Sequence, residues 1–211
     1  MTLVLGTNCG FVTTAPTTDP GGTNNGAMST KANGFRVTTP AIHKIRITEM
    51  GWYVNAATND ANTQMGIYTS DGTDENPDDL IESTGDFSKG TTEGWVKKTD
   101  LNIILEPSTT YWICAQCDIS ADTYVDIHAD ATQAYNLKND QTELPDPWDG
   151  SVWSLGYLAG FYALYEVVYN YINIGDVWKE VKAIKINIED TWKTVSGMQI
   201  NSNGSEWSTV F

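Results

Sequence analysis

The chain has 211 residues, with 27 Asp and Glu against 12 Lys and Arg, and a formal net charge of −15. This balance argues against nucleic-acid binding, because that affinity depends on neutralising phosphates with Lys and Arg. No apolar run reaches the roughly 18 residues of a membrane helix, so no membrane insertion is expected. Three cysteines do not make a disulfide framework.

The N-terminal quarter of the chain is predicted to hold short strands separated by one long connection. Strand-like apolar runs occupy residues 11–14, 35–37 and 42–53. Between them, residues 13–33 consist mostly of Thr, Pro, Gly, Asn and Ala, a composition that buries little. We expect an extended loop or arm there, which either stays mobile or wraps a neighbouring subunit in an oligomer.

Residues 47–117 show the clearest periodicity, because apolar side chains recur at alternate positions between clusters of Gly, Asn, Asp, Ser and Pro. A period of two indicates strands with one buried face, and the polar clusters are turn-forming. No window shows a convincing 3.6-residue period. The chain is therefore predicted to be all-β, an antiparallel β-sandwich of jelly-roll type. The alternating residues include Met65, Ile67, Leu101, Ile103, Leu105, Tyr111, Ile113 and Ala115.

The same stretch carries a resemblance to a known type of module. It contains GIYTSDG at 66–72, LIES at 80–83, GW at 94–95, LNIILEP at 101–107 and YW at 111–112, in that order. This order resembles a β-sandwich module of phage tail-fibre and other virion proteins, which also occurs in some bacterial surface proteins. The resemblance covers about a third of the chain; it implies a β-sandwich and says little about function.

Strand patterns continue to residue 171 and then give way to a repeat. Residues 124–129, 134–138 and 161–171 resemble strands, and 139–154 is rich in turn residues, so a sandwich domain is predicted for 1–168. In residues 169–211, three units each place a Trp after a turn, which predicts one β-hairpin per repeat. The pair INIGDVWKEV and INIEDTWKTV is similar to repeats that end many phage structural proteins.

A hairpin cannot bury its own Trp, so the repeats should stack on each other or on other subunits. We therefore expect a homo-oligomer, with a trimer as the first choice. Its subunit contacts should involve Trp178, Trp192 and Trp207.

Two local clusters raise the question of metals. Cys114 and Cys117 form a C-x-x-C, but residues three apart on a strand point to opposite faces, which favours buried reduced thiols over a redox or zinc pair. The segment 70–79, SDGTDENPDD, is dense in the oxygen ligands that calcium prefers. Asp71, Asp74 and Asp78 are its candidate calcium ligands, with a solvated hairpin connection as the alternative; no other cofactor is expected.

Aromatic residues beside carboxylates mark a candidate glycan site in the loop 145–157. Trp148, Trp153 and Tyr157 could stack on a sugar ring, while Asp146 and Asp149 could accept hydrogen bonds from its hydroxyls. The alternative is that one or both tryptophans plug the end of the sandwich.

The sequence thus favours a non-enzymatic virion structural protein, a part of a phage fibre, tail or capsid-surface appendage that may contact host glycans. No G-x-S-x-G, H-E-x-x-H or P-loop pattern occurs, and there are only two histidines. Expected partners are further copies of the chain and other virion proteins. The N-terminus lacks the features of a secretory signal, which fits a virion component made in a host cytoplasm. A capsid decoration protein and the carbohydrate-binding module of a secreted or cell-surface system remain as alternatives.

Overall fold

The computed structural model contains two compact units, Met1–Val167 and Val168–Phe211; the sequence places this boundary between residues 168 and 169. The structure describes residues 2–209, with gaps at 22–23, 42, 58, 74–75, 119–122, 150–152, 170, 175–176, 181–184, 189–190, 195–198 and 202–206. For residues 24–25, 56–57, 153–155 and 171 onward, only the backbone is described.

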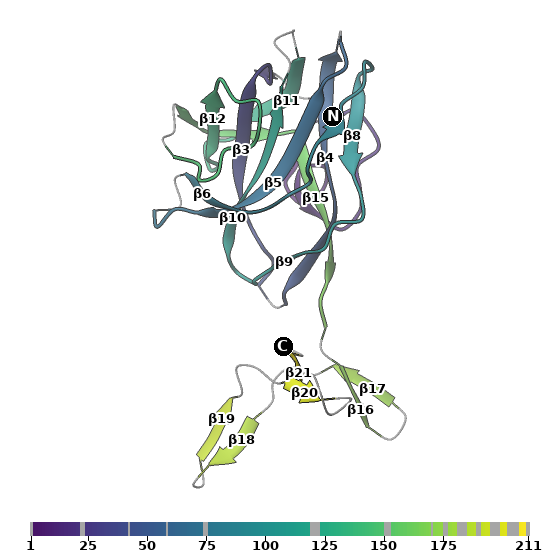
Figure 1. The fold of residues 1–211 in the computed structure, drawn as a ribbon, viewed down its shortest axis with the longest axis vertical. Helices are drawn as coiled ribbons and strands as arrows, with labels where there is room; N and C mark the ends of the chain where they lie inside the picture. Colours follow the sequence, from purple (N-terminus) through teal and green to yellow (C-terminus); the bar gives the residue numbers. More distant parts are fainter. Residues whose placement is uncertain are drawn as a thin grey trace. The chain divides into compact units, whose positions relative to one another are not determined.

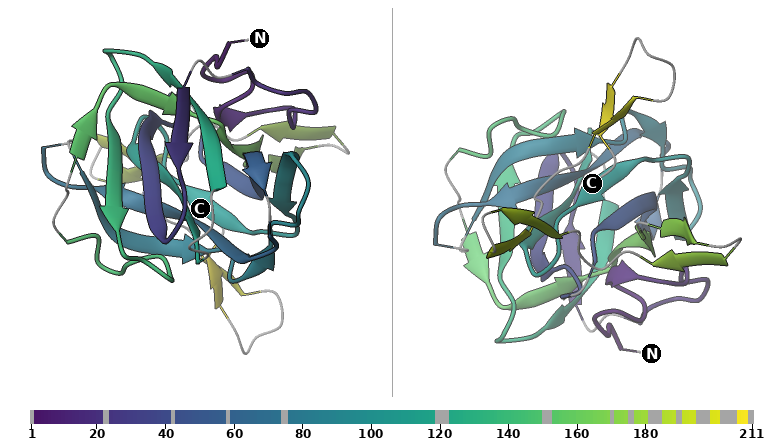
Figure 2. Two further views of the ribbon diagram at one scale, coloured as in Figure 1. Left: turned by 90° about the horizontal axis from the view of Figure 1, so that it is seen from above. Right: turned by 90° about the horizontal axis from the view of Figure 1, so that it is seen from below.

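The first unit is a sandwich of two β-sheets (Figure 1; Figure 2 gives two further views). The seven-stranded sheet has the order β13 (Trp153–Leu155), β12 (Tyr135–Asn139), β3 (Lys31–Thr38), β10 (Thr110–Cys117), β5 (Asn62–Ser70) and β6 (Pro77–Ser83), with β7 (Phe87–Ser88) also paired to β5. The predicted all-β sandwich is confirmed.

The eight-stranded sheet is built around the long strand β4 (Ile45–Ala57). Its order is β1 (Gly10–Val12), β15 (Phe161–Val167), β4, β11 (Thr123–Ala129) and β14 (Tyr157–Ala159), with β2 (Asn24–Ala27) paired to β11 and with β8 (Gly94–Lys98) and β9 (Ile103–Leu105) paired to β4. The pair of β1 and β15 is parallel, unlike the antiparallel pairing expected throughout. A parallel pair is allowed here because about 150 residues of chain separate the two strands.

The core between the sheets follows the predicted alternation. Met65 and Ile67 of β5 and Ile113 and Ala115 of β10 are fully buried, and Ile103 and Leu105 of β9 join them. Period-two patterns therefore identified the inward faces correctly in the central strands. Ile81, by contrast, is exposed on β6.

The predicted arm at residues 13–33 is only partly an arm. Its second half forms β2, which pairs with β11, and the start of β3, where Ala32 and Asn33 are fully buried. Met28 is the reason: its side chain is fully buried in the core, and its N–H donates to the Thr123 carbonyl at 2.8 Å. A single large apolar side chain thus draws a polar segment onto the sandwich.

The second unit consists of three β-hairpins, each a separate two-stranded sheet in the described part of the chain. They are β16 (Tyr171–Ile174) with β17 (Val177–Glu180), β18 (Lys185–Ile188) with β19 (Thr191–Thr194), and β20 (Gln199–Asn201) with β21 (Trp207–Thr209).

Candidate functional site

A loop covers the outer face of the seven-stranded sheet where the glycan site was expected. We call residues 140–149 the strap. Its Leu144 and Trp148 pack on residues of the sheet and form with them an apolar cluster separate from the core, the outer cluster, whose other members are Ala32, Tyr68, Trp112 and Cys114. Because β5 and β10 also carry inward-facing Ile67 and Ile113, both faces of these strands are apolar and the outer face needs a cover.

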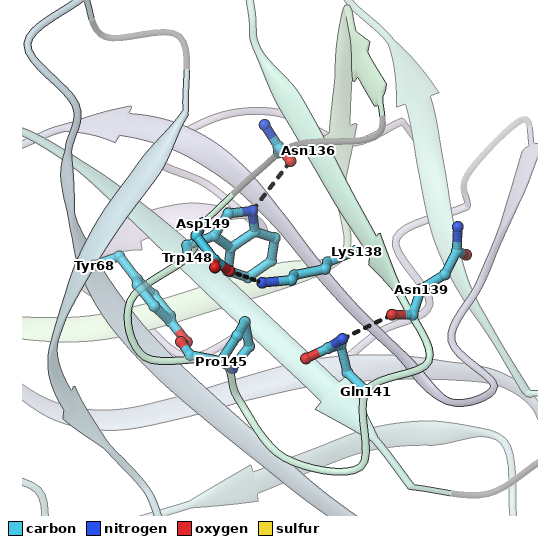
Figure 3. A network of polar contacts seen from close by, with 8 residues as sticks. All are labelled: Tyr68, Asn136, Lys138, Asn139, Gln141, Pro145, Trp148 and Asp149. Atoms are coloured by element: carbon cyan, nitrogen blue, oxygen red, sulfur yellow. Dashed lines mark hydrogen bonds and ion pairs between the residues drawn. The ribbon is translucent and has the colours of Figure 1, made fainter.

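Trp148 is the centre of this cover rather than a surface residue. Only 3% of it is exposed, and its ring meets Tyr68 edge-on with centroids 5.4 Å apart. Figure 3 shows its indole nitrogen pointing to Asn136, whose Oδ1 accepts the hydrogen bond at 3.3 Å. The expectation that Trp148 stacks on a sugar is therefore wrong in this structure, because neither ring face is open. It is a plug, as in the alternative, but it covers the outer face of the seven-stranded sheet and not the end of the sandwich.

The remaining residues of the expected glycan site do not converge with it. Asp146 accepts a hydrogen bond from the Leu80 N–H at 3.3 Å. Asp149 is exposed and pairs with Lys138 at 2.5 Å (Figure 3), and this contact lowers the pKa of its carboxyl. Tyr157 lies on the other sheet, half-buried, with its ring 6.2 Å from that of Tyr135. The side chain of Trp153 lies outside the described residues.

In the acidic loop 70–79, the carboxylate of Asp71 shapes the turn. Asp71 Oδ1 accepts from the Thr73 N–H at 3.2 Å and from its hydroxyl at 2.9 Å, while Oδ2 accepts from Asn76 at 2.9 Å. The carbonyl of Asp78 accepts from the Trp148 N–H at 2.8 Å. Asp74 lies outside the described residues. Within the described part, no group of three or more His, Cys, Asp or Glu side chains is arranged to hold a metal.

The cysteines behave as strand residues. Cys114 belongs to the outer cluster and Cys117 to the core, so the two thiols lie on opposite faces of β10, as the strand geometry predicts. All three cysteines are buried thiols. Burial raises the pKa of Cys114 well above its usual value, and burial together with Asp130 raises that of Cys9 to about 12. The Cys9 and Cys114 thiols therefore stay protonated at neutral pH and are poor nucleophiles or metal ligands.

A second aromatic group, not recognised from the sequence, lies on the outer face of the eight-stranded sheet. This aromatic row comprises Tyr53, Trp95 and Tyr162, with Trp95 edge-on to both neighbours at 5.4 and 5.2 Å. The Tyr53 hydroxyl donates to Glu93 at 3.0 Å and the Tyr162 hydroxyl to Glu49 at 2.5 Å. Burial and these carboxylates raise the pKa of both phenols.

The first half of the predicted arm contacts this row. Trp95 Nε1 donates to the Thr18 carbonyl at 2.8 Å, and Pro20 is buried. Residues 13–21 therefore contact the sandwich of their own chain. Strand parity could have shown the row, since Tyr53 follows the inward-facing Trp52 and Tyr162 follows Phe161.

A groove lies at one end of the seven-stranded sheet. It has a volume of about 490 Å³ and lies where β5 ends and β10 begins, lined by Thr69, Ser70, Ser108, Thr109, Thr110 and Tyr111. We call it the hydroxyl groove, because every lining side chain carries a hydroxyl. The only sequence signal for it is the run PSTTY at 107–111.

Thr39 and Tyr111 hold the turn that forms the groove. The Thr39 hydroxyl donates to the Glu106 carbonyl at 2.6 Å and accepts from the Thr109 N–H at 3.0 Å. The Tyr111 hydroxyl accepts from the Glu106 N–H at 3.1 Å. Ser108, at the tip, has a φ of +50°, a conformation that residues other than Gly, Asn and Asp adopt rarely.

Each hairpin of the second unit pairs an Asn with a Trp, five residues apart in the first two hairpins and six in the third. Asn173 pairs with Trp178, Asn187 with Trp192 and Asn201 with Trp207. The predicted hairpin per repeat is thus present in the backbone. Whether the tryptophan side chains meet other subunits is a prediction that lies outside the described residues.

Comparisons of the chain with models of known families, with curated proteins and with solved structures found no match. The described residues contain no helix long and apolar enough to cross a membrane.

Proposed function

We propose that this chain is a non-enzymatic structural protein of a virion, a fibre, tail or surface-appendage component, whose C-terminal hairpins join several copies into an oligomer. The observation that carries the proposal is the pairing repeated in the three hairpins, each of which pairs Asn with Trp. Three copies of one local arrangement within a single chain favour a repeated contact, as in other repeat architectures.

The isolation of the hairpins supports assembly. Each is a two-stranded sheet that the described part of the chain extends no further. A two-stranded hairpin is marginally stable in water and needs further strands or packing. Other copies of the chain would supply that packing, and we propose a trimer, one of the closed cyclic assemblies that homo-oligomers form.

The chemistry of the sandwich supports a structural role. The two tyrosines of the aromatic row each donate to a carboxylate, Tyr53 to Glu93 and Tyr162 to Glu49. The three thiols are buried, which makes them poor nucleophiles. The net charge of −15 favours solubility of a protein displayed in many copies. The phage-like repeats point to a virion as the place of assembly.

Labelling of particles tests this function. Gold-conjugated antibody against the sandwich should decorate purified virions from the source of the chain at a tail, a fibre or a surface appendage. Label spread over the capsid lattice alone would favour capsid decoration instead. Labelled protein found only as a free species outside particles would contradict the proposal and favour a secreted carbohydrate-binding module.

A further inference from the structure

We propose that the hydroxyl groove is a binding site for a neutral saccharide. Its volume of about 490 Å³ falls within the usual range of small-molecule sites, and it is open at one end of a rigid sandwich. The site is distinct from the loop at 145–157, whose Trp148 is buried beneath the strap.

The lining contains hydroxyls with unused hydrogen-bonding capacity. Trp112 Nε1 donates to Ser70 Oγ at 3.1 Å, which occupies one lone pair and leaves the Ser70 proton to donate. Tyr111 faces the core, where its hydroxyl accepts from the Glu106 N–H, so it forms the wall of the groove and offers little to a ligand. Among the described residues, the O–H groups of Ser70 and Ser108 have no acceptor. A ligand that carries many hydroxyls, each donor and acceptor, matches such a surface.

The absence of charge in the groove selects against ions. None of its six lining side chains is ionisable at neutral pH. The backbone N–H groups of Ser108 and Thr109 already donate to Pro40 and Thr39, so they do not form an anion cradle. Phosphates and acidic sugars would also meet a chain of net charge −15. Cations would find no carboxylate ligand in the lining.

The groove lacks an exposed aromatic ring face on which a sugar could stack, and this limits the affinity of a single site. Tyr111 is its only aromatic residue and is 6% exposed. With hydrogen bonds alone, binding in the millimolar range is expected. Display of several copies would raise the avidity by about 10²- to 10⁴-fold. That gain rests on the proposed oligomer, whereas binding by a single groove does not.

The test is saturation-transfer NMR on the full chain with named probes. The neutral probes are methyl α-glucoside, methyl β-galactoside, maltose and lactose, and 3′-sialyllactose is the charged comparison. We expect saturation transfer to at least one neutral probe. No transfer to any neutral probe, or transfer to sialyllactose alone, would overturn the proposal.

Two glycine variants locate the site. Ser108→Gly removes a lining hydroxyl while glycine accepts the φ of +50° without strain, so the fold should persist. The loss of one hydrogen bond should raise the dissociation constant for the neutral probe about 2- to 12-fold. Thr30→Gly is the matched control, because Thr30 has a φ of +48° and lies outside the groove, and its hydroxyl, the group that the variant removes, bonds only the Ser29 carbonyl. Equal affinity in Ser108→Gly and the unmodified chain, or equal loss in both variants, would rule out this site.

Discussion

Removing the Trp148 ring should destabilise the sandwich strongly. Trp148→Ala empties the space beneath the strap, where 97% of the residue is buried, and removes the edge-on contact with Tyr68 and the hydrogen bond to Asn136. Replacing a buried Trp by Ala costs about 3–5 kcal/mol. For a unit of 150–250 residues, this corresponds to a fall in melting temperature of about 6–20 °C.

The measurement is thermal unfolding followed by near-UV circular dichroism. Trp148→Phe keeps most of the ring and should lose less, with about 0.5–1.5 kcal/mol from the hydrogen bond. Asp149→Asn is the neighbouring control; its exposed ion pair with Lys138 contributes little, so the melting temperature should stay close to that of the native chain. An unchanged melting temperature in Trp148→Ala would refute the claim that Trp148 is packed between the strap and the sheet. The strap would then be only a loose surface loop.

Three further predictions concern packing, alkaline stability and charge. Gly51→Ala should lower stability by about 1–3 kcal/mol, because a Cβ there would lie 2.6 Å from the Tyr162 ring and 2.8 Å from the Val96 carbonyl; an unchanged denaturant midpoint would show that the aromatic row is not packed as described. The pKa of Cys9 is raised from 9.0 to about 12, so the folded state holds its proton more tightly than the unfolded state. Its contribution to stability is therefore complete below pH 9 and is lost as the pH rises from 9 towards 12; melting temperatures measured from pH 7 to 11 should fall above pH 9, and a flat profile would contradict the burial of Cys9. Finally, a net charge of −15 should prevent binding to nucleic acid at physiological salt, and micromolar binding in a gel-shift titration would disprove this.

The alternating patterns predicted the sandwich because each central strand turns one face to a shared core. Met65 and Ile67 on β5 and Ile113 and Ala115 on β10 fill that core, and their spacing alone identified the inward face. The opposite faces of the same strands were harder to interpret. Tyr68 and Trp112 are also buried, so β5 and β10 are covered on both sides, and the continuous run YWICA at 111–115 was the sign of it.

The candidate sites depended on contacts between distant residues. Trp148 lies in a loop whose composition suits a ligand as well as a plug; only its packing on Tyr68, 80 positions earlier in the chain, decides between them. The groove joins the end of β5 to a turn about 40 residues later, which strand patterns cannot show. Composition predicted a loop or arm for residues 13–33 that buries little, but the side chain of Met28 is buried in the core and holds the second half of this segment on the sandwich.

Sedimentation equilibrium of the intact chain tests the proposed assembly most directly. The repeated Asn–Trp pairing of three isolated hairpins predicts a homo-oligomer, with a mass of about three times the 23.2 kDa of one chain at micromolar concentration. A chain that stops at residue 168 should sediment as a monomer, because it keeps the sandwich and loses the hairpins. A mass of 23.2 kDa for the intact chain across the same concentrations would contradict the proposal.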